Sequence, residues 1–124
     1  MVGRGCGAIV NAGSTVIVRG SRRAPQYAAT TYGLLGVTKS YAKALAPTVR
    51  VNTFAPGFKE TEALLNRPEW QDGRREVVLS GTADGKIAKP EEMTGGAFFQ
   101  ASDDAHHITG SYMSADGGYS MLGT

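Results

Sequence analysis

Three short apolar runs, each followed by a turn, predict the strands of this chain. Residues 7–11 are apolar on both faces of a pleat, which is typical of a strand buried on both sides of a parallel sheet. Residues 49–54 carry β-branched and aromatic side chains and run into Ala55-Pro56-Gly57. Residues 111–115 run into Asp116-Gly117-Gly118, where glycine suits a tight turn. We therefore predict strands over these three ranges.

Helical periodicity is clearest between the first two strands. Helix formers fill residues 27–46, and Pro47 ends the segment because it lacks the N–H that a helix requires. A second helix is expected from Pro90, since Glu91 and Glu92 favour the positive end of a helix dipole. The residues expected to pack on the core from 27–46 are Leu34, Leu35, Val37, Tyr41 and Leu45, with Lys39 and Lys43 on a wetter face. We expect a loop over residues 15–26 and short helical segments at 61–65 and 69–79.

This order of elements predicts the fold class. A strand, a helix, a strand, a helix and a strand at this spacing make two parallel crossover units. The result is an α/β domain of three layers, with crossover helices around a small parallel sheet of about three strands. No repeat or linker divides residues 1–124, so we expect a single domain. The first and last strands have an open edge, to which the two-sided apolar residues 8–10 are poorly suited.

Composition and charge exclude several classes. The 17 glycines follow no triplet period, which excludes collagen, and the 41% hydrophobic content argues against disorder. The net charge of +2 is too small and too dispersed for a nucleic-acid or anionic-membrane partner. Cys6 is the single cysteine and cannot form an internal disulfide, and no apolar stretch reaches the length of a signal peptide or membrane span. We expect a cytoplasmic protein.

Several short motifs occur along the chain in one order. Asn11-Ala12-Gly13-Ser14 closes the first strand, and Tyr27 follows Ser14 by 13 residues. Further along are Gly-Leu-Leu-Gly-Val-Thr-Lys-Ser at 33–40, Arg-Val-Asn at 50–52, Pro56-Gly57 with Thr61, and the segments 90–92, 101–103, 108–110 and 116–118. As a set, these motifs resemble the C-terminal half of the short-chain dehydrogenase/reductase family, whose members are about twice as long. The resemblance covers nearly the whole chain.

The resemblance implies a fold and a reaction. It implies part of a Rossmann-like sheet, and an oxidoreductase that interconverts small-molecule alcohols and carbonyl compounds with NAD(P). The glycine-rich turn that would hold the cofactor pyrophosphate is absent, since Gly3, Gly5 and Gly7 have no strand before them and no helix after them. The expectation is therefore a truncated oxidoreductase whose own chain lacks a complete NAD(P) site.

The resemblance also assigns catalytic roles. In the family, the tyrosine at the position of Tyr27 exchanges a proton with the substrate oxygen, and the serine at the position of Ser14 hydrogen-bonds that oxygen. A free phenol has a pKa of about 10, so the family places a lysine one helical turn later to stabilise the phenolate. Here that position is Thr31, which carries no charge, and Lys39 lies about 12 Å further along the helix. Arg22 or Arg23 is the alternative source of positive charge.

The cofactor loop of the family matches Pro56, Gly57 and Thr61, which the resemblance places at the nicotinamide end of NAD(P). Two further readings stay open. The chain is alternatively a non-catalytic assembly module or gene fragment, forming homo-oligomers through the helix at 27–46 and the C-terminal strand, as family members do. A serine hydrolase using Ser14 is the remote alternative, because no Gly-x-Ser-x-Gly elbow surrounds that serine.

No metal site is expected. His106 and His107 are adjacent, so their side chains diverge, and no third ligand converges on them. We interpret the pair as part of a solvated loop.

Overall fold

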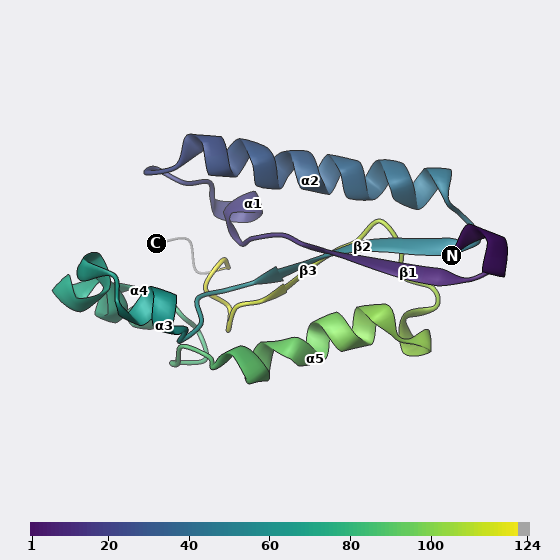
Figure 1. Ribbon diagram of the computed structural model, residues 1–124. Coiled ribbons are helices and arrows are strands. Elements are labelled where there is room, and N and C mark those ends of the chain that lie inside the picture. The colour runs from purple at the N-terminus through teal and green to yellow at the C-terminus, as the bar shows by residue number, and fades with distance from the viewer. Residues whose placement is uncertain (122–124) are drawn as a thin grey trace.

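The three predicted strands form one parallel sheet. The computed structural model describes residues 1–121. Strands β1 (Gly7–Ala12), β2 (Val49–Pro56) and β3 (Tyr112–Ala115) lie in the order β1-β2-β3 (Figure 1). β1 pairs with β2 along its length, whereas β3 pairs only with the second half of β2. The predicted sheet is confirmed.

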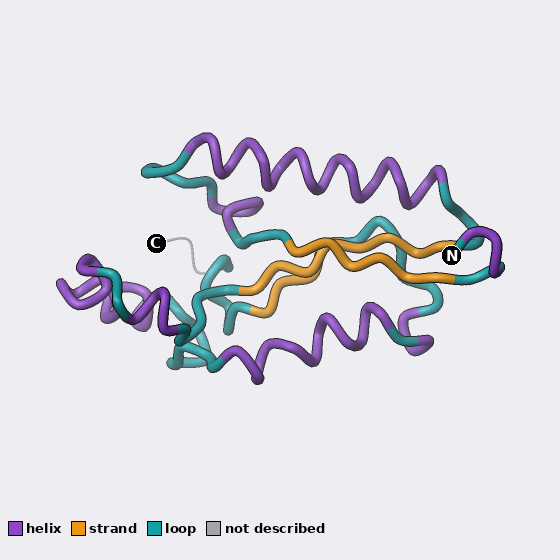
Figure 2. The backbone as a smooth tube through the Cα atoms, in the orientation of Figure 1, coloured by secondary structure: helices purple, strands orange, loops and turns teal. Residues whose placement is uncertain are grey.

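Two long helices cover the two faces of the sheet. Helix α2 (Pro25–Ala44) lies on one face and α5 (Pro90–Ala101) on the other, so the predicted three layers are confirmed (Figure 2). α2 begins two residues before the predicted range, because a proline is tolerated in the first turn, where its missing N–H is not needed. α5 begins at Pro90 as predicted, and the backbone N–H of Lys89 donates to Glu92 Oε2 at 2.8 Å.

The shorter elements differ from the predicted pattern. The expected loop at 15–26 contains α1 (Val16–Arg19), so that part of the prediction was wrong. The predicted turn at 61–65 is α3 (Glu62–Leu65). The predicted helix at 69–79 is broken into η2 (Trp70–Arg74) and α4 (Arg75–Ser80), because Gly73 adopts a φ of 85°. Single turns η1 (Val2–Arg4) and η3 (Asp103–Ala105) complete the described elements.

Helix α2 packs on the sheet through only some of the residues predicted, since Leu45, at its end, packs on the core, whereas two others do not. Its buried residues are Thr31, Thr38 and Ala42, whereas Val37 and Tyr41 are 45% and 54% exposed. The expectation that Val37 and Tyr41 face the core was therefore wrong. The physical reason is that small residues allow the helix backbone to approach the sheet closely, and the buried hydroxyl of Thr38 finds partners on the strands.

The central strand carries the core. β2 is buried almost throughout, and Val49 and Val51 pack with Ala42 of α2. β1 lies at the edge of the sheet and is only half-buried, so the prediction that it is buried on both faces was wrong. An edge strand has a neighbouring strand on one side only. The apolar side chains of β1 are therefore only partly shielded from solvent.

Polar side chains of β2 form hydrogen bonds with residues 100–111. Arg50 donates to the carbonyl oxygens of Gln100 and Ser102 at 2.8 and 2.9 Å, which lie at the end of α5. Asn52 donates to the carbonyl of Ile108 and accepts from the backbone N–H and hydroxyl of Ser111. The Arg-Val-Asn motif therefore aligns β3 beside β2. Within residues 1–121, no helix is long and apolar enough to cross a membrane.

Candidate functional site

The loops that leave the three parallel strands gather at one edge of the sheet (Figure 1). Backbone pairing continues just past the strands, because the N–H of Gly13 donates to Phe54 O at 2.7 Å and that of Gly57 to Ala115 O at 2.9 Å. The loops therefore start side by side. In open α/β sheets, ligands bind outside the carboxyl ends of the strands, which makes this edge the candidate site.

Two cavities lie at this carboxyl edge. The larger has a volume of about 1160 Å³ and lies between the segment that follows β1 and the segment from Phe58 to Val77. The smaller has a volume of about 240 Å³ and lies between residues 82–93 and the turn after β3. Tyr119 and Phe58 line both cavities. The three loops thus enclose space where the fold predicts a ligand.

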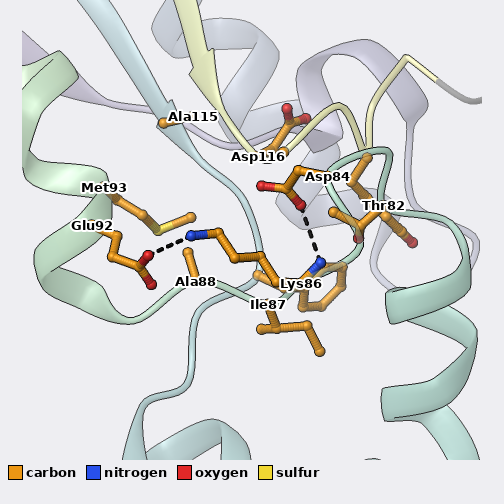
Figure 3. A pocket seen from close by; sticks show the side chains of 12 residues that line it. Thr82, Asp84, Lys86, Ile87, Ala88, Glu92, Met93, Ala115 and Asp116 are labelled. Carbon is orange, nitrogen blue, oxygen red and sulfur yellow. Dashed lines mark hydrogen bonds and ion pairs between the residues drawn. The ribbon is translucent and has the colours of Figure 1, made fainter.

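The smaller cavity holds a paired lysine (Figure 3). Lys86 Nζ forms an ion pair with Glu92, and the backbone N–H of Lys86 donates to Asp84 Oδ1 at 3.2 Å. The hydrogen bond from Lys86, followed by that from the backbone of Lys89, lowers the pKa of Glu92, and the bond to Glu92 raises the pKa of Lys86. Because each charge compensates the other, this cavity offers no unpaired lysine as a catalytic group.

Ser14 is the second residue after β1 and is half-buried at the carboxyl edge. Its Oγ accepts a hydrogen bond from the backbone N–H of Val16 at 3.3 Å, which supports the start of α1. The next two residues, Thr15 and Val16, line the larger cavity, although Ser14 itself does not. The structure thus places Ser14 beside the cavity.

Tyr27 lies in the first turn of α2, which starts at the same end of the molecule as the carboxyl edge (Figure 1). Its side chain is 49% exposed and lines neither cavity. The expectation that the hydroxyls of Ser14 and Tyr27 meet at one substrate oxygen stays a prediction.

Thr31 occupies the position one turn after Tyr27. The side chain is 6% exposed, and its Oγ1 donates to the carbonyl oxygens of Tyr27 and Ala28, each at 3.0 Å. The hydroxyl is therefore engaged within its own helix, as threonine hydroxyls often are. It supplies neither a charge nor a free donor to the neighbouring phenol.

The predicted cofactor loop lies where β2 ends. A Cβ on Gly57 would lie 2.5 Å from Asp116 Cβ and 2.6 Å from Asp116 Cα, so only glycine allows the loops after β2 and β3 to approach this closely. Pro56 is half-buried, and the Thr61 side chain accepts from the backbone N–H of Leu64 at 3.3 Å and caps α3. The structure brings Ser14, Pro56, Gly57 and Thr61 to one edge.

Residues that sequence reasoning did not select line the larger cavity. Arg19 Nη1 donates to Tyr119 O at 2.8 Å, and its guanidinium carbon lies 4.2 Å from the centre of the Tyr119 ring. Trp70 is 4% exposed, stacks on Phe58 and also lines this cavity. The repeated arginines in residues 15–26 were the available signal, but their partners lie far along the chain.

Comparisons with known proteins give a consistent result. The family described as enoyl-(acyl carrier protein) reductase matches residues 1–120. The 3-oxoacyl-(acyl-carrier-protein) reductase of Thermotoga maritima is 42% identical over 113 residues, which cover 90% of this chain and 45% of that protein. A Sinorhizobium meliloti protein described as a short-chain alcohol dehydrogenase superposes with a TM-score of 0.86 at 35% identity, covering 95% of this chain and 47% of the other. The chain belongs to the short-chain dehydrogenase/reductase family.

A further member of the short-chain dehydrogenase/reductase family has been solved with a cofactor. A Beutenbergia cavernae protein described as an NAD(P)-dependent gluconate 5-dehydrogenase, with NADP bound at low occupancy, has a TM-score of 0.88 at 33% identity, with coverage of 96% and 48%. The present chain spans about half the length of the curated relatives it matches.

The loop after β2 carries no side chain where it passes Asp116, because only glycine permits this close approach. The Thr61 hydroxyl lies further along the same loop, where it caps α3. Within residues 1–121, no strand is followed by a turn with the family's three glycines, because Gly3 and Gly5 precede β1 and Gly7 is its first residue. The described residues therefore lack the family's pyrophosphate turn, and the assignment of Pro56, Gly57 and Thr61 to the nicotinamide end stays a prediction. No cluster of three or more His, Cys, Asp or Glu suitable for a metal occurs among the described residues.

Proposed function

We propose that this chain forms the substrate side of an oxidoreductase site that interconverts a small-molecule alcohol and a carbonyl compound with NAD(P). The observation that supports it most is the superposition of 96% of the chain on an NADP-bound relative, with the loops after all three strands at the carboxyl edge. The cofactor, when bound, supplies or accepts the hydride.

Ser14 and Tyr27 act on the substrate oxygen. The Ser14 hydroxyl donates a hydrogen bond to the carbonyl oxygen, and Tyr27 exchanges a proton with it. Pro56, Gly57 and Thr61 hold the nicotinamide end of the cofactor. Thr31 carries no charge, and its hydroxyl donates to the carbonyls of Tyr27 and Ala28. Position 31 therefore gives the phenolate no positive neighbour, and slow turnover is expected.

The test is carbonyl reduction by the full chain at excess NADPH, followed by the loss of reduced-nicotinamide absorbance. Tyr27→Phe is expected to lower the rate roughly 100-fold or more, because it removes the proton donor. Tyr32→Phe is the matched control, since Tyr32 is equally exposed on the same helix. Equal rates for Tyr27→Phe and the unchanged chain, or no NADPH oxidation with any carbonyl of a broad panel, would overturn the proposal.

A second candidate function is homo-oligomer assembly through α2. Three large side chains with apolar or aromatic surface border the outward face of this helix and are about half exposed, namely Tyr32, Val37 and Tyr41. Gly33, Gly36 and Ser40 lie between them and allow a second helix to approach closely. We propose that a second copy covers this face, and that the region of β3 contributes another contact.

Light scattering after size exclusion tests the assembly. The unchanged chain is expected to be a dimer or larger, and Val37→Glu with Tyr41→Glu is expected to give a monomer, because two charges would be buried without partners. Lys39→Glu is the control on the same helix. A monomer at all concentrations would contradict the assembly.

We also propose a cytoplasmic location. The chain has a single cysteine, Cys6, which is exposed and cannot form a disulfide within the chain. The lack of an internal disulfide is typical of proteins in a reducing compartment. Fractionation of expressing cells, with the chain tagged at either end, tests this location.

A further inference from the structure

The larger cavity is lined by many more positive than negative charges. Five arginines border it, namely Arg19, Arg22, Arg23, Arg67 and Arg74, and Glu69 is the acidic residue that lines it. The arginines come from two walls, since the first three follow β1 and the other two follow β2. A cleft with such an excess of positive charge attracts anions and concentrates them at its surface.

Most of these guanidinium groups have no protein partner. Arg19 is held by the carbonyl and ring of Tyr119. Within residues 1–121, the side chains of Arg22, Arg23, Arg67 and Arg74 make no hydrogen bond or ion pair. Ion pairs with other groups therefore do not account for their presence, and their donors are available to a ligand.

Trp70 also lines the cavity and is 4% exposed. Its Nε1 is itself buried and makes no hydrogen bond to any described residue, so it is not counted among the donors open to a ligand. The unpaired guanidinium groups by themselves favour a ligand rich in acceptor atoms.

We propose that this cavity binds a small molecule that carries a phosphate or carboxylate group. Both groups match the planar fork of an arginine, which forms two parallel hydrogen bonds with them. The volume of about 1160 Å³ leaves room for a metabolite-sized ligand. This inference goes beyond the proposed reaction, because anion binding needs neither cofactor nor turnover. If the proposed reaction also holds, the position of Thr15 and Val16 beside Ser14 makes the substrate an anionic carbonyl compound.

The chain contains its own reporter for this site. Trp70 is the single tryptophan, so its fluorescence responds to occupation of the cavity without interference from another indole. Titration with inorganic pyrophosphate and, separately, with succinate distinguishes phosphate from carboxylate ligands. Potassium chloride keeps the ionic strength constant, and glycerol serves as the neutral probe. We expect a saturable change with at least one anion and none with glycerol.

Variants on the two walls test whether the anion lies between them. Arg23→Ser and Arg67→Ser each remove an exposed guanidinium, so loss of folding is not expected. Each is expected to weaken binding roughly tenfold, as for a lost hydrogen bond to a charged group. Lys39→Ser removes one positive charge from α2, outside the cavity, and should leave binding unchanged.

Three results would overturn the proposal. They are the absence of saturable binding by either anion at constant ionic strength, an equal loss of affinity in Lys39→Ser, and unchanged affinity in both arginine variants. A failure of NADPH oxidation does not bear on this result, because fluorescence reports binding alone. The two proposals therefore fail separately.

Discussion

The hydroxyl oxygens of Thr38 on α2 and Thr53 on β2 lie 2.8 Å apart, and neither side chain is exposed. Asn11 Nδ2 on β1 donates to the same Thr38 oxygen at 2.9 Å. One threonine hydroxyl therefore joins the helix to two strands. This contact fixes the face that α2 turns to the sheet, and with it the face that stays exposed.

Removing this hydroxyl is expected to destabilise the fold. Thr38→Val should lower the free energy of unfolding by about 1–3 kcal/mol, because it leaves the polar groups of Asn11 and Thr53 without their partner. The double variant with Thr53→Val should cost less than the sum of the two single changes, since one unpaired hydroxyl disappears. Urea unfolding measures all four corners of the cycle, with the exposed Thr30→Val as the control. Strict additivity would contradict a direct contact.

Periodicity could not reveal this arrangement. It counts Thr31 and Thr38 as polar and Val37 and Tyr41 as apolar, and so assigns these four residues to the wrong sides of the helix. The partners that allow Thr38 to be buried lie on strands 15 and 27 residues away in sequence. Helix α1 escaped prediction for a related reason, because a four-residue segment with two valines and an isoleucine has little helical preference of its own.

The same limit applied to the candidate site. The sequence correctly placed Ser14 just after the first strand, Tyr27 near the start of the long helix and Gly57 in the turn after the second strand. The arginine-lined cavity could not be predicted from the sequence. Arg23 and Arg67 line the same cavity only because the loops after β1 and β2 fold against each other. Local patterns identify elements, whereas a cavity depends on how distant elements pack.

Replacing either of two glycines by alanine should change the stability of the fold in opposite directions. Gly57→Ala is expected to destabilise the fold by about 1–3 kcal/mol, because its new Cβ would overlap the Cβ and backbone of Asp116. Gly36→Ala should stabilise it by about 1 kcal/mol, since nothing lies within 4 Å and alanine favours a helix interior. Thermal unfolding compares the two. A harmless Gly57→Ala would mean that the loops after β2 and β3 are further apart than described.

The pairing of Lys86 with Glu92 predicts how stability depends on pH. The pKa of Glu92 is lowered from 4.5, so its contribution is present above that value and is lost as pH falls through the folded pKa. The pKa of Lys86 is raised from 10.5, so its contribution is present below that value and is lost as pH rises through the folded pKa. Both groups are exposed, and the effect should be small.

Melting temperatures measured across the pH range test this pair. Lys86→Met is expected to reduce both the fall in melting temperature at acid pH that is due to Glu92 and the fall at alkaline pH that is due to Lys86. Lys39→Met, which removes a lysine without an ion-pair partner in the described residues, should keep both falls. Identical profiles for Lys86→Met and the unchanged chain would show that the pair does not form in solution.

A lysine at position 31 should raise the activity. Thr31→Lys places a cation one turn after Tyr27, where it stabilises the phenolate, and is expected to raise kcat/KM for carbonyl reduction at least about tenfold. Thr31→Met is the control of similar length without charge. An equal gain in both variants would trace the effect to packing, and no gain would argue against Tyr27 as the proton donor.

The carboxyl ends of the three strands are expected to bind the nicotinamide end of the cofactor. Amide chemical shifts recorded by NMR during addition of reduced nicotinamide mononucleotide, which lacks the adenosine half, test this binding most directly. We expect saturable shifts at Ser14, Gly57 and Thr61, and none in Val2–Arg4, which lies at the amino end of β1. Shifts centred on the glycines before β1, or no shifts anywhere, would contradict this expectation.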